Sequence, residues 1–149
     1  MDVTFFRTLS LTKGLTAAEI DRLGRLVIEK RVAAGDKLLT EGAAAAGVFL
    51  VRDGKVKVTK RNAAKAEKGV ARLEAPTVLG ELELISGRPC FASAVAETEV
   101  LAYVLSPEAF DALVNGGDSL ASKMTRNIAR VVIDRLAETN TRLVAVLNA

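Results

Sequence analysis

The sequence has no histidine and only one cysteine among its 149 residues. Without histidine, the chain cannot form the usual zinc sites, a Ser-His-Asp triad or a histidine-held metal centre. A single cysteine cannot form a disulfide within the chain, which is typical of a protein from a reducing cytoplasm. Because no nucleophile stands beside a base and no metal-ligand cluster is present, we expect neither an enzyme nor a metal or cofactor site.

The sequence also lacks a long apolar run. No stretch reaches the length that crosses a bilayer, and the N-terminus has an early Asp2 and no basic region, unlike a signal peptide. The net charge of +3 gives little support for nucleic-acid binding. We therefore expect a cytoplasmic protein that binds neither membranes nor DNA. Its length and its 50% hydrophobic content predict one folded domain, residues 1–149.

An amphipathic helix is predicted over residues 15–30. Thr16 is suited to be its N-cap and Glu19 would complete a capping box, while Leu15 and Ile20 are spaced for a hydrophobic staple. Short strand-like runs follow, at 29–32, 37–40, 48–52, 55–60, 70–73, 91–97 and 99–105.

Two kinds of connection separate these strands. Asp53-Gly54 is a two-residue hairpin signal between the third and fourth runs. Residues 61–69 are expected to form an exposed loop. Ser106 and Pro107 then open a short helix that glycines end at 116–117.

A long helix is expected to follow from a cap at Asp118 to about residue 147. Six of its residues recur at alternating spacings of three and four, which is a heptad seam and predicts a homodimer. The seam consists of Ala129, Val132, Leu136, Thr139, Leu143 and Val146. An offset stripe of Met124, Ile128 and Val131 would pack on its own domain. The alternative is one broad stripe packed on a single core.

Basic residues are interleaved with acidic ones along the same helix. A solvated face is therefore favoured over a DNA surface. The basic residues are Lys123, Arg126, Arg130, Arg135 and Arg142.

Residues 78–93 carry the clearest functional pattern. Gly80 allows a close backbone approach, and the amides of a short helix after it can donate to a phosphate. A Gly-Glu-Leu triplet alone also opens ordinary surface helices, so the evidence lies in the whole stretch. It resembles the phosphate-binding cassette of the cyclic nucleotide-binding domain family. Family positions are held by Gly80, Glu81, Leu82, Leu84, Pro89, Ala92 and Ser93.

The run from 31 to 58 resembles the first half of the same family's β-roll. The resemblance implies an α+β fold that is mostly β, with a cupin-like β-roll over about 30–105. An N-terminal helix and a long C-terminal helix at about 118–147 would flank the roll.

The resemblance also implies a cyclic nucleotide ligand, cAMP or cGMP. Gly80, Glu81 and Leu82 would hold its ribose and phosphate, helped by the amides around residues 90–92, and Ser93 would support the cassette. Thr139 and Asn140 match a pair that contacts the purine in a family member. Alternatively, Thr139 belongs only to the seam and Asn140 is exposed.

The cassette departs from the family at several positions. Cys90 stands where the family has the arginine that pairs with the phosphate, and a thiol gives at most a weak donor. Phe91 adds bulk, Glu83 would repel a phosphate, and Arg88 is the only nearby substitute cation. Binding is therefore expected to be weak.

Two functions remain open at this stage. The first is a signalling module that passes cyclic nucleotide binding through its C-terminal helix to an unidentified effector protein, without a DNA-binding domain. The second is a ligand-free dimeric interaction module. Cys90 would be a redox-sensing thiol if Arg88 lowered its pKa, or else a buried inert one.

Overall fold

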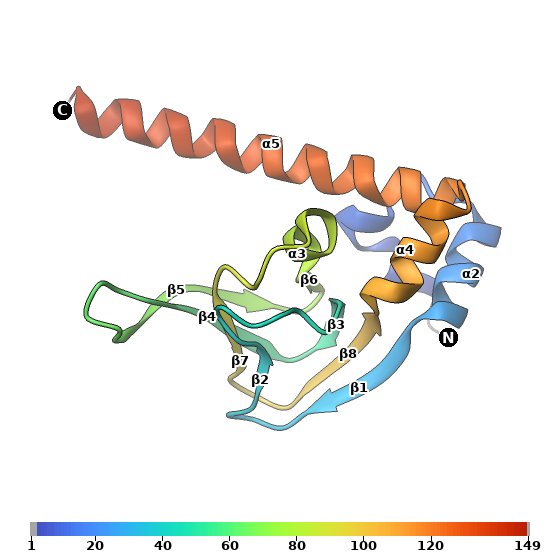
Figure 1. The fold of residues 1–149 in the computed structure, drawn as a ribbon, viewed down its shortest axis with the longest axis horizontal. Coiled ribbons are helices and arrows are strands. Elements are labelled where there is room, and N and C mark those ends of the chain that lie inside the picture. Colours follow the sequence, from blue (N-terminus) through green and yellow to red (C-terminus); the bar gives the residue numbers. More distant parts are fainter. Residues whose placement is uncertain (1–2, 149) are drawn as a thin grey trace.

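Residues 3–148, which the computed structural model describes, form two four-stranded antiparallel sheets with one core between them (Figure 1). Across the first sheet the strands are β1 (Ile28–Val32), β8 (Val100–Leu105), β3 (Val48–Asp53) and β6 (Thr77–Leu79). Across the second they are β2 (Lys37–Leu39), β7 (Ser93–Ala96), β4 (Lys55–Arg61) and β5 (Glu67–Glu74). The predicted β-roll is therefore confirmed.

Helices flank the roll at both ends of the chain, as predicted, and a second apolar core joins them to the first sheet through Leu50 and Leu105. A single short helix, α3, lies within the roll between β6 and β7. The helices are α1 (Val3–Arg7), η1 (Ser10–Thr12), α2 (Ala17–Leu26), α3 (Glu81–Ser86), α4 (Pro107–Asn115) and α5 (Ser119–Leu147).

The Asp53-Gly54 turn is not the hairpin that we predicted. β3 pairs with β6 and β8, while β4 pairs with β5 and β7, so the two strands beside this turn belong to different sheets. A Cβ on Gly54 would lie 2.5 Å from the Glu99 carbonyl oxygen, and its φ is +108°. The glycine therefore marks a tight corner where the chain crosses between sheets.

Several elements are shorter than predicted. The helix predicted over 15–30 is Ala17–Leu26, because Val27 is already extended and Ile28 begins β1. The loop predicted over 61–69 is shorter, since Arg61 belongs to β4 and residues 67–69 belong to β5. The strand predicted over 91–97 begins only at Ser93, which leaves Phe91 in a loop.

The predicted helix caps are present. The Thr16 hydroxyl accepts from the Glu19 amide while the Glu19 carboxylate accepts from the Thr16 amide, which completes the capping box. Ser106 and Asp118 accept from amides in the first turns of α4 and α5. These local signals are reliable because each involves residues within one turn of a helix.

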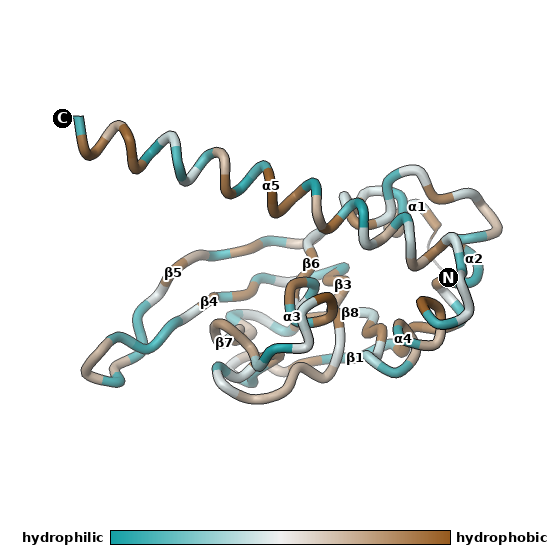
Figure 2. The backbone as a smooth tube through the Cα atoms, turned by 45° about the horizontal axis from the view of Figure 1, so that its top comes forward, coloured by the Kyte–Doolittle hydropathy of each residue, from teal (hydrophilic) through white to brown (hydrophobic). Residues whose placement is uncertain are grey.

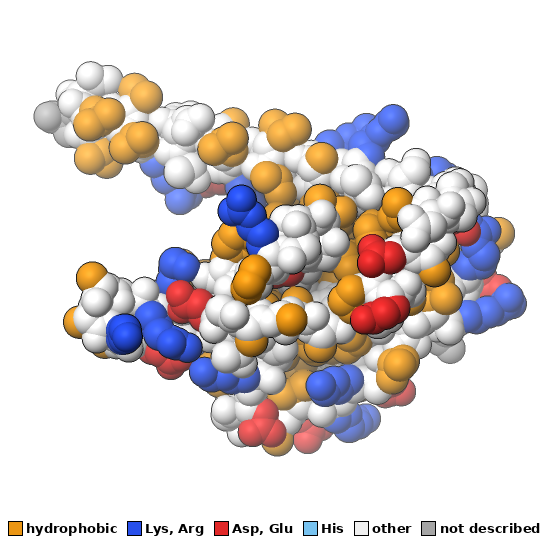
Figure 3. All heavy atoms as spheres, viewed as in Figure 1, with side chains coloured by type: hydrophobic (Ala, Val, Ile, Leu, Met, Phe, Trp, Pro, Cys, Tyr) orange, Lys and Arg blue, Asp and Glu red, His pale blue; other side chains and the backbone are white. Residues whose placement is uncertain are grey.

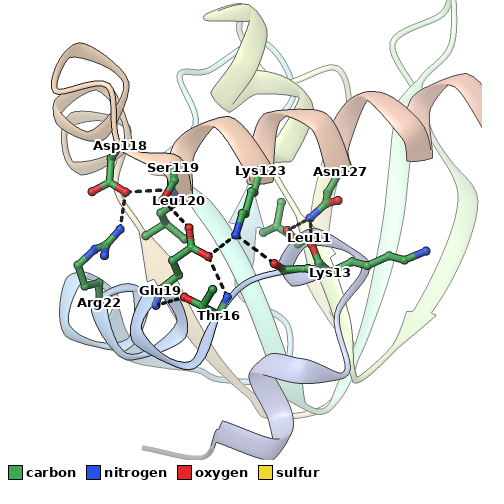
Figure 4. Close-up of polar contacts among 11 residues, drawn as sticks. Leu11, Lys13, Thr16, Glu19, Arg22, Asp118, Ser119, Leu120, Lys123 and Asn127 are labelled. Atoms are coloured by element: carbon green, nitrogen blue, oxygen red, sulfur yellow. Dashed lines mark hydrogen bonds and ion pairs between the residues drawn. The ribbon is translucent and has the colours of Figure 1, made fainter.

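Glu19 has a second role that the sequence did not reveal. Its buried carboxylate accepts from the Lys123 ammonium at 2.6 Å and the Ser119 hydroxyl at 2.5 Å (Figure 4). These hydrogen bonds lower the pKa of the Glu19 carboxyl to about 2, and the bond from Lys123 has the largest effect. Lys123 is thus only partly solvated, and the contacts fix the start of α5 against α2.

α5 is buried only in its first part. Met124 and Ile128 are buried in the helical core and Val131 is half-buried, as expected for the second stripe. Beyond them α5 projects past the roll with apolar residues recurring along it (Figure 2). All six seam residues are exposed. Along residues 3–148, none of the helices combines the length and apolar character that a membrane crossing needs.

Candidate ligand-binding site

A cleft of about 390 Å³ lies between α3, the loop before β7, the second sheet and α5. Apolar side chains of the second sheet, including Val58 and Leu73, form its floor. Six of the ten predicted ligand residues line it: Gly80, Glu81, Leu82, Phe91, Ala92 and Ser93. These six cassette residues therefore face one shared cavity, and Glu83 lies in the same wall.

Gly80 begins α3 in a left-handed conformation, with φ +85°. A Cβ at this position would lie 2.5 Å from the Gly47 carbonyl oxygen. The close approach that requires glycine is thus to the protein's own backbone, at the turn before β3. Gly80 positions the helix that carries Glu81 and Glu83 into the cleft.

Glu81 projects from α3 toward α5. Its side chain is 14% exposed, and its carboxylate lies 3.6 Å from the guanidinium of Arg135. Burial raises the pKa of the Glu81 carboxyl above its usual range, and Arg135 partly opposes this rise. The ion-pair partner of Glu81 thus comes from α5 and not from the cassette itself.

Glu83 makes the contact that most affects anion binding. Its carboxylate accepts a hydrogen bond from the Phe91 amide at 3.2 Å. On the other side of this loop, the Lys60 ammonium donates to the Phe91 carbonyl at 2.5 Å. One of the amides expected to hold a phosphate is thus already bonded to a carboxylate.

Ser93 ties the same loop to the segment after β2. Its side chain is buried, and its hydroxyl accepts from the Glu41 amide at 2.9 Å. Glu41 in turn accepts from the Arg61 amide at 2.9 Å. The loop is therefore held from both sides by polar contacts.

Cys90 does not face the cleft. It is 3% exposed and packs in the core between the sheets, while its amide and carbonyl pair with Ala43 and Gly42. Burial, assisted by the Glu83 charge, raises the pKa of the thiol. A reactive cysteine requires the opposite shift, so the suggestion that Arg88 activates Cys90 is wrong.

Three further predicted residues lie outside the cleft. Arg88 lines a separate hollow with Pro89 and Asp111. Thr139 and Asn140 are exposed on α5, beyond the part of the helix that reaches the cleft. Their role as ligand residues remains a prediction.

Arg135 is the site residue that our sequence reasoning missed, because we assigned it to a solvated face. It is the only cation that lines the cleft among the residues the structure describes. Its position could have been found, since it continues the buried stripe of Met124, Ile128 and Val131 at helical spacing.

Comparison with known proteins places this geometry in a family. The family model for the cyclic nucleotide-binding domain matches residues 29–116, which include the whole cassette. A solved cyclic nucleotide-binding domain from Methylobacillus flagellatus superposes with a TM-score of 0.81 at 24% identity. The superposition covers 95% of this chain and 84% of the Methylobacillus flagellatus chain.

Two relatives identified by sequence are much longer than this chain. Glutaminase 1 of Bradyrhizobium diazoefficiens is 27% identical over 133 residues, which are 89% of this chain and 21% of that protein. A cAMP-dependent protein kinase regulatory subunit of Yarrowia lipolytica is 29% identical over 111 residues, 74% of this chain and 28% of that protein. The chain thus spans about a quarter of their length. From the family match and the cleft together, the chain belongs to the cyclic nucleotide-binding domain family.

Proposed function

We propose that this domain binds a cyclic nucleotide, cAMP or cGMP, weakly in the cassette cleft and transmits binding through α5. The observation that carries the proposal is the ion pair between Glu81 of the cassette and Arg135 of α5. Both side chains line the cleft, so a ligand there contacts the cassette and the long helix together. A regulatory role agrees with the kinase regulatory subunit among the relatives.

The chemistry of the pair suits a ribose phosphate. A ribose hydroxyl can donate to the Glu81 carboxylate, and the Arg135 guanidinium can pair with an anionic phosphate. A bound ligand would compete for both members of the pair and change how strongly α3 is held to α5. Coupling of this kind links the affinity for ligand to the position of the helix.

Weak binding follows from the charges around the cleft. Two carboxylates, Glu81 and Glu83, face one guanidinium, and the Phe91 amide is already occupied by Glu83. A phosphate must displace Glu83 from this amide and overcome its repulsion. Loss of a charge-assisted bond from the cassette arginine costs roughly 1.5–3 kcal/mol, which weakens binding by about one to two orders of magnitude.

The partner of the helix is proposed to be a second copy of this chain. The six seam residues and Ile133, which is 63% exposed, form an apolar face on the projecting part of α5. Large apolar residues exposed at this spacing are typical of helix pairing. The dimer would transmit the change to an effector protein.

The second candidate function is a ligand-free dimeric interaction module. It is favoured by Glu83, which satisfies the Phe91 amide without any ligand, and by the buried position of Cys90. In this case Glu81 and Arg135 would only hold α5 to the roll.

Calorimetric titration with cAMP and cGMP separates the two functions. Binding by the wild-type protein that is lost in Glu81→Ala and weakened in Arg135→Ala supports the signalling module. Arg142→Ala is the matched control, since Arg142 lies on the same helix and, among residues 3–148, forms its ion pair with Glu138. If neither nucleotide binds at millimolar concentration, the interaction module replaces our proposal for these two ligands.

A further inference from the structure

The positive charge of this protein is concentrated in the β4–β5 hairpin. Residues 55–74 contain seven lysines and arginines and two glutamates, a net charge of +5, whereas the whole chain carries +3. The remainder of the chain is therefore slightly acidic. The hairpin extends from the roll, and basic side chains gather over it at the lower left of Figure 3.

Like charges face each other across this hairpin. Lys57 is paired with Arg72 and Lys60 with Lys68 in the antiparallel register. Like charges directly opposite each other destabilise a sheet. Arg72 and Lys60 are neutralised by Glu97 and Glu41, at 2.9 and 3.4 Å.

Other cations of the hairpin have no such partner. Lys57, Lys65 and Lys68 form no ion pair with any residue between 3 and 148. Three uncompensated cations on one ribbon repel one another, and an anionic partner would relieve this repulsion.

The hairpin also offers backbone groups. β5 is the last strand of its sheet and, within the described residues, pairs only with β4. Seven of its eight residues are exposed, and Val70 at the bulge is 63% exposed. An unpaired edge can accept another strand. Lysines on such an edge repel a second basic edge, but they attract a strand that carries acidic side chains.

We propose that β5 binds an extended acidic segment of a partner protein, which adds to the sheet as a further strand. Its carboxylates would pair with Lys68 of β5, with Lys65 of the turn and with Lys57 of β4, whose side chain lies beside Gly69 of β5. Val70 would contact an apolar side chain. A nucleic acid would use the charges but not the edge amides and carbonyls or Val70. The free edge is therefore the observation that favours a protein partner.

Fluorescence anisotropy at low salt, with a labelled peptide of alternating Glu and Thr, tests this proposal on the whole chain. Lys57→Glu/Lys68→Glu should weaken binding by about tenfold, because two attractive contacts become repulsive. Lys13→Glu/Arg126→Glu, which changes two exposed cations outside the hairpin, is the control with the same net charge and should bind nearly as the wild type does. Unchanged melting temperatures establish that each variant is folded.

Two further measurements separate strand addition from charge attraction alone. The same peptide with alternate backbone nitrogens methylated keeps its charge but loses hydrogen bonds, so it should bind several-fold more weakly. Hydrogen exchange of the β5 amides should slow when the unmodified peptide is added. Equal binding of both peptides, unchanged exchange, tighter binding of a short DNA duplex, or no peptide binding would each overturn the proposal.

Discussion

Replacing Glu19 by Gln tests the contact that fixes α5 at its base. Glutamine keeps the size of the side chain and can still accept from the Thr16 amide, so the substitution removes mainly the charge. We expect the free energy of unfolding at neutral pH to fall, and the loss to disappear in acid.

The magnitude follows from the pKa of Glu19, which is lowered from 4.5 to about 2. At about 1.4 kcal/mol per pKa unit, linkage gives an upper bound on the order of 3 kcal/mol. Because the side chain of Lys123 is 37% exposed and screened by solvent, we expect about 2 kcal/mol. Because the pKa of Glu19 is lower in the folded than in the unfolded state, its ionised carboxylate stabilises the fold at neutral pH. This stabilisation is lost as the pH falls from 4.5 toward 2 and the carboxylate is protonated.

Denaturant unfolding followed by circular dichroism, at several pH values from neutral to about 3, measures this difference. Glu138→Gln is the control, because Glu138 forms an exposed pair with Arg142 within α5 and should cost at most about 0.5 kcal/mol. If Glu19→Gln lowers stability equally at neutral pH and near pH 3, the loss does not come from the charge and the reasoning is wrong.

Three other substitutions test the site and the helix. Glu83→Ala should strengthen cyclic nucleotide binding by about tenfold in calorimetry, because it removes a repelling charge and frees the Phe91 amide. Gly80→Ala should lower the free energy of unfolding by at least about 2 kcal/mol, since a Cβ meets the Gly47 carbonyl at a positive φ. Leu136→Glu should convert a dimer into a monomer in light scattering, because a charge in the apolar seam is costly to desolvate.

Each of these substitutions has a matched control. Glu108→Gln removes a carboxylate that does not line the cleft and should leave nucleotide binding unchanged. Gly87→Ala introduces a Cβ at φ +67° with nothing within 4 Å, so it isolates backbone strain from the clash at Gly80. Thr141→Glu adds a charge to α5 outside the seam. A wild-type protein that is monomeric at high micromolar concentration would refute the dimer.

The sequence predicted most of the fold because its signals are local. The capping box of Thr16 and Glu19, the cap at Asp118 and the cassette helix after Gly80 each depend on residues close together in the chain. The Asp53-Gly54 corner shows the limit of such signals. A glycine turn indicates that the chain reverses, but pairing with β8 and β5 decides which sheet each strand joins.

The candidate site was predicted less completely, because its polar contacts join distant parts of the chain. Arg135 reaches Glu81 across more than fifty residues, and no local pattern links the two. The direction of Cys90 is set by its backbone pairing with Ala43, which positions the thiol in the core. Contacts of this kind depend on how the helices pack on the roll.

The shape of α5 has a mechanical consequence. If the buried Met124 serves as a pivot, Arg135 lies about 16 Å along the helix from it and Leu147 about 34 Å, at roughly 1.5 Å per residue. A rigid helix that tilts about this pivot moves its far end about twice as far as it moves at Arg135. A displacement of about 1 Å at the Glu81 ion pair would therefore become about 2 Å at the tip, enough to change the packing of side chains there. Arg135 thus lies at the cleft about midway between the buried part of α5 and its far end, so a tilt of the helix would be largest at Leu147.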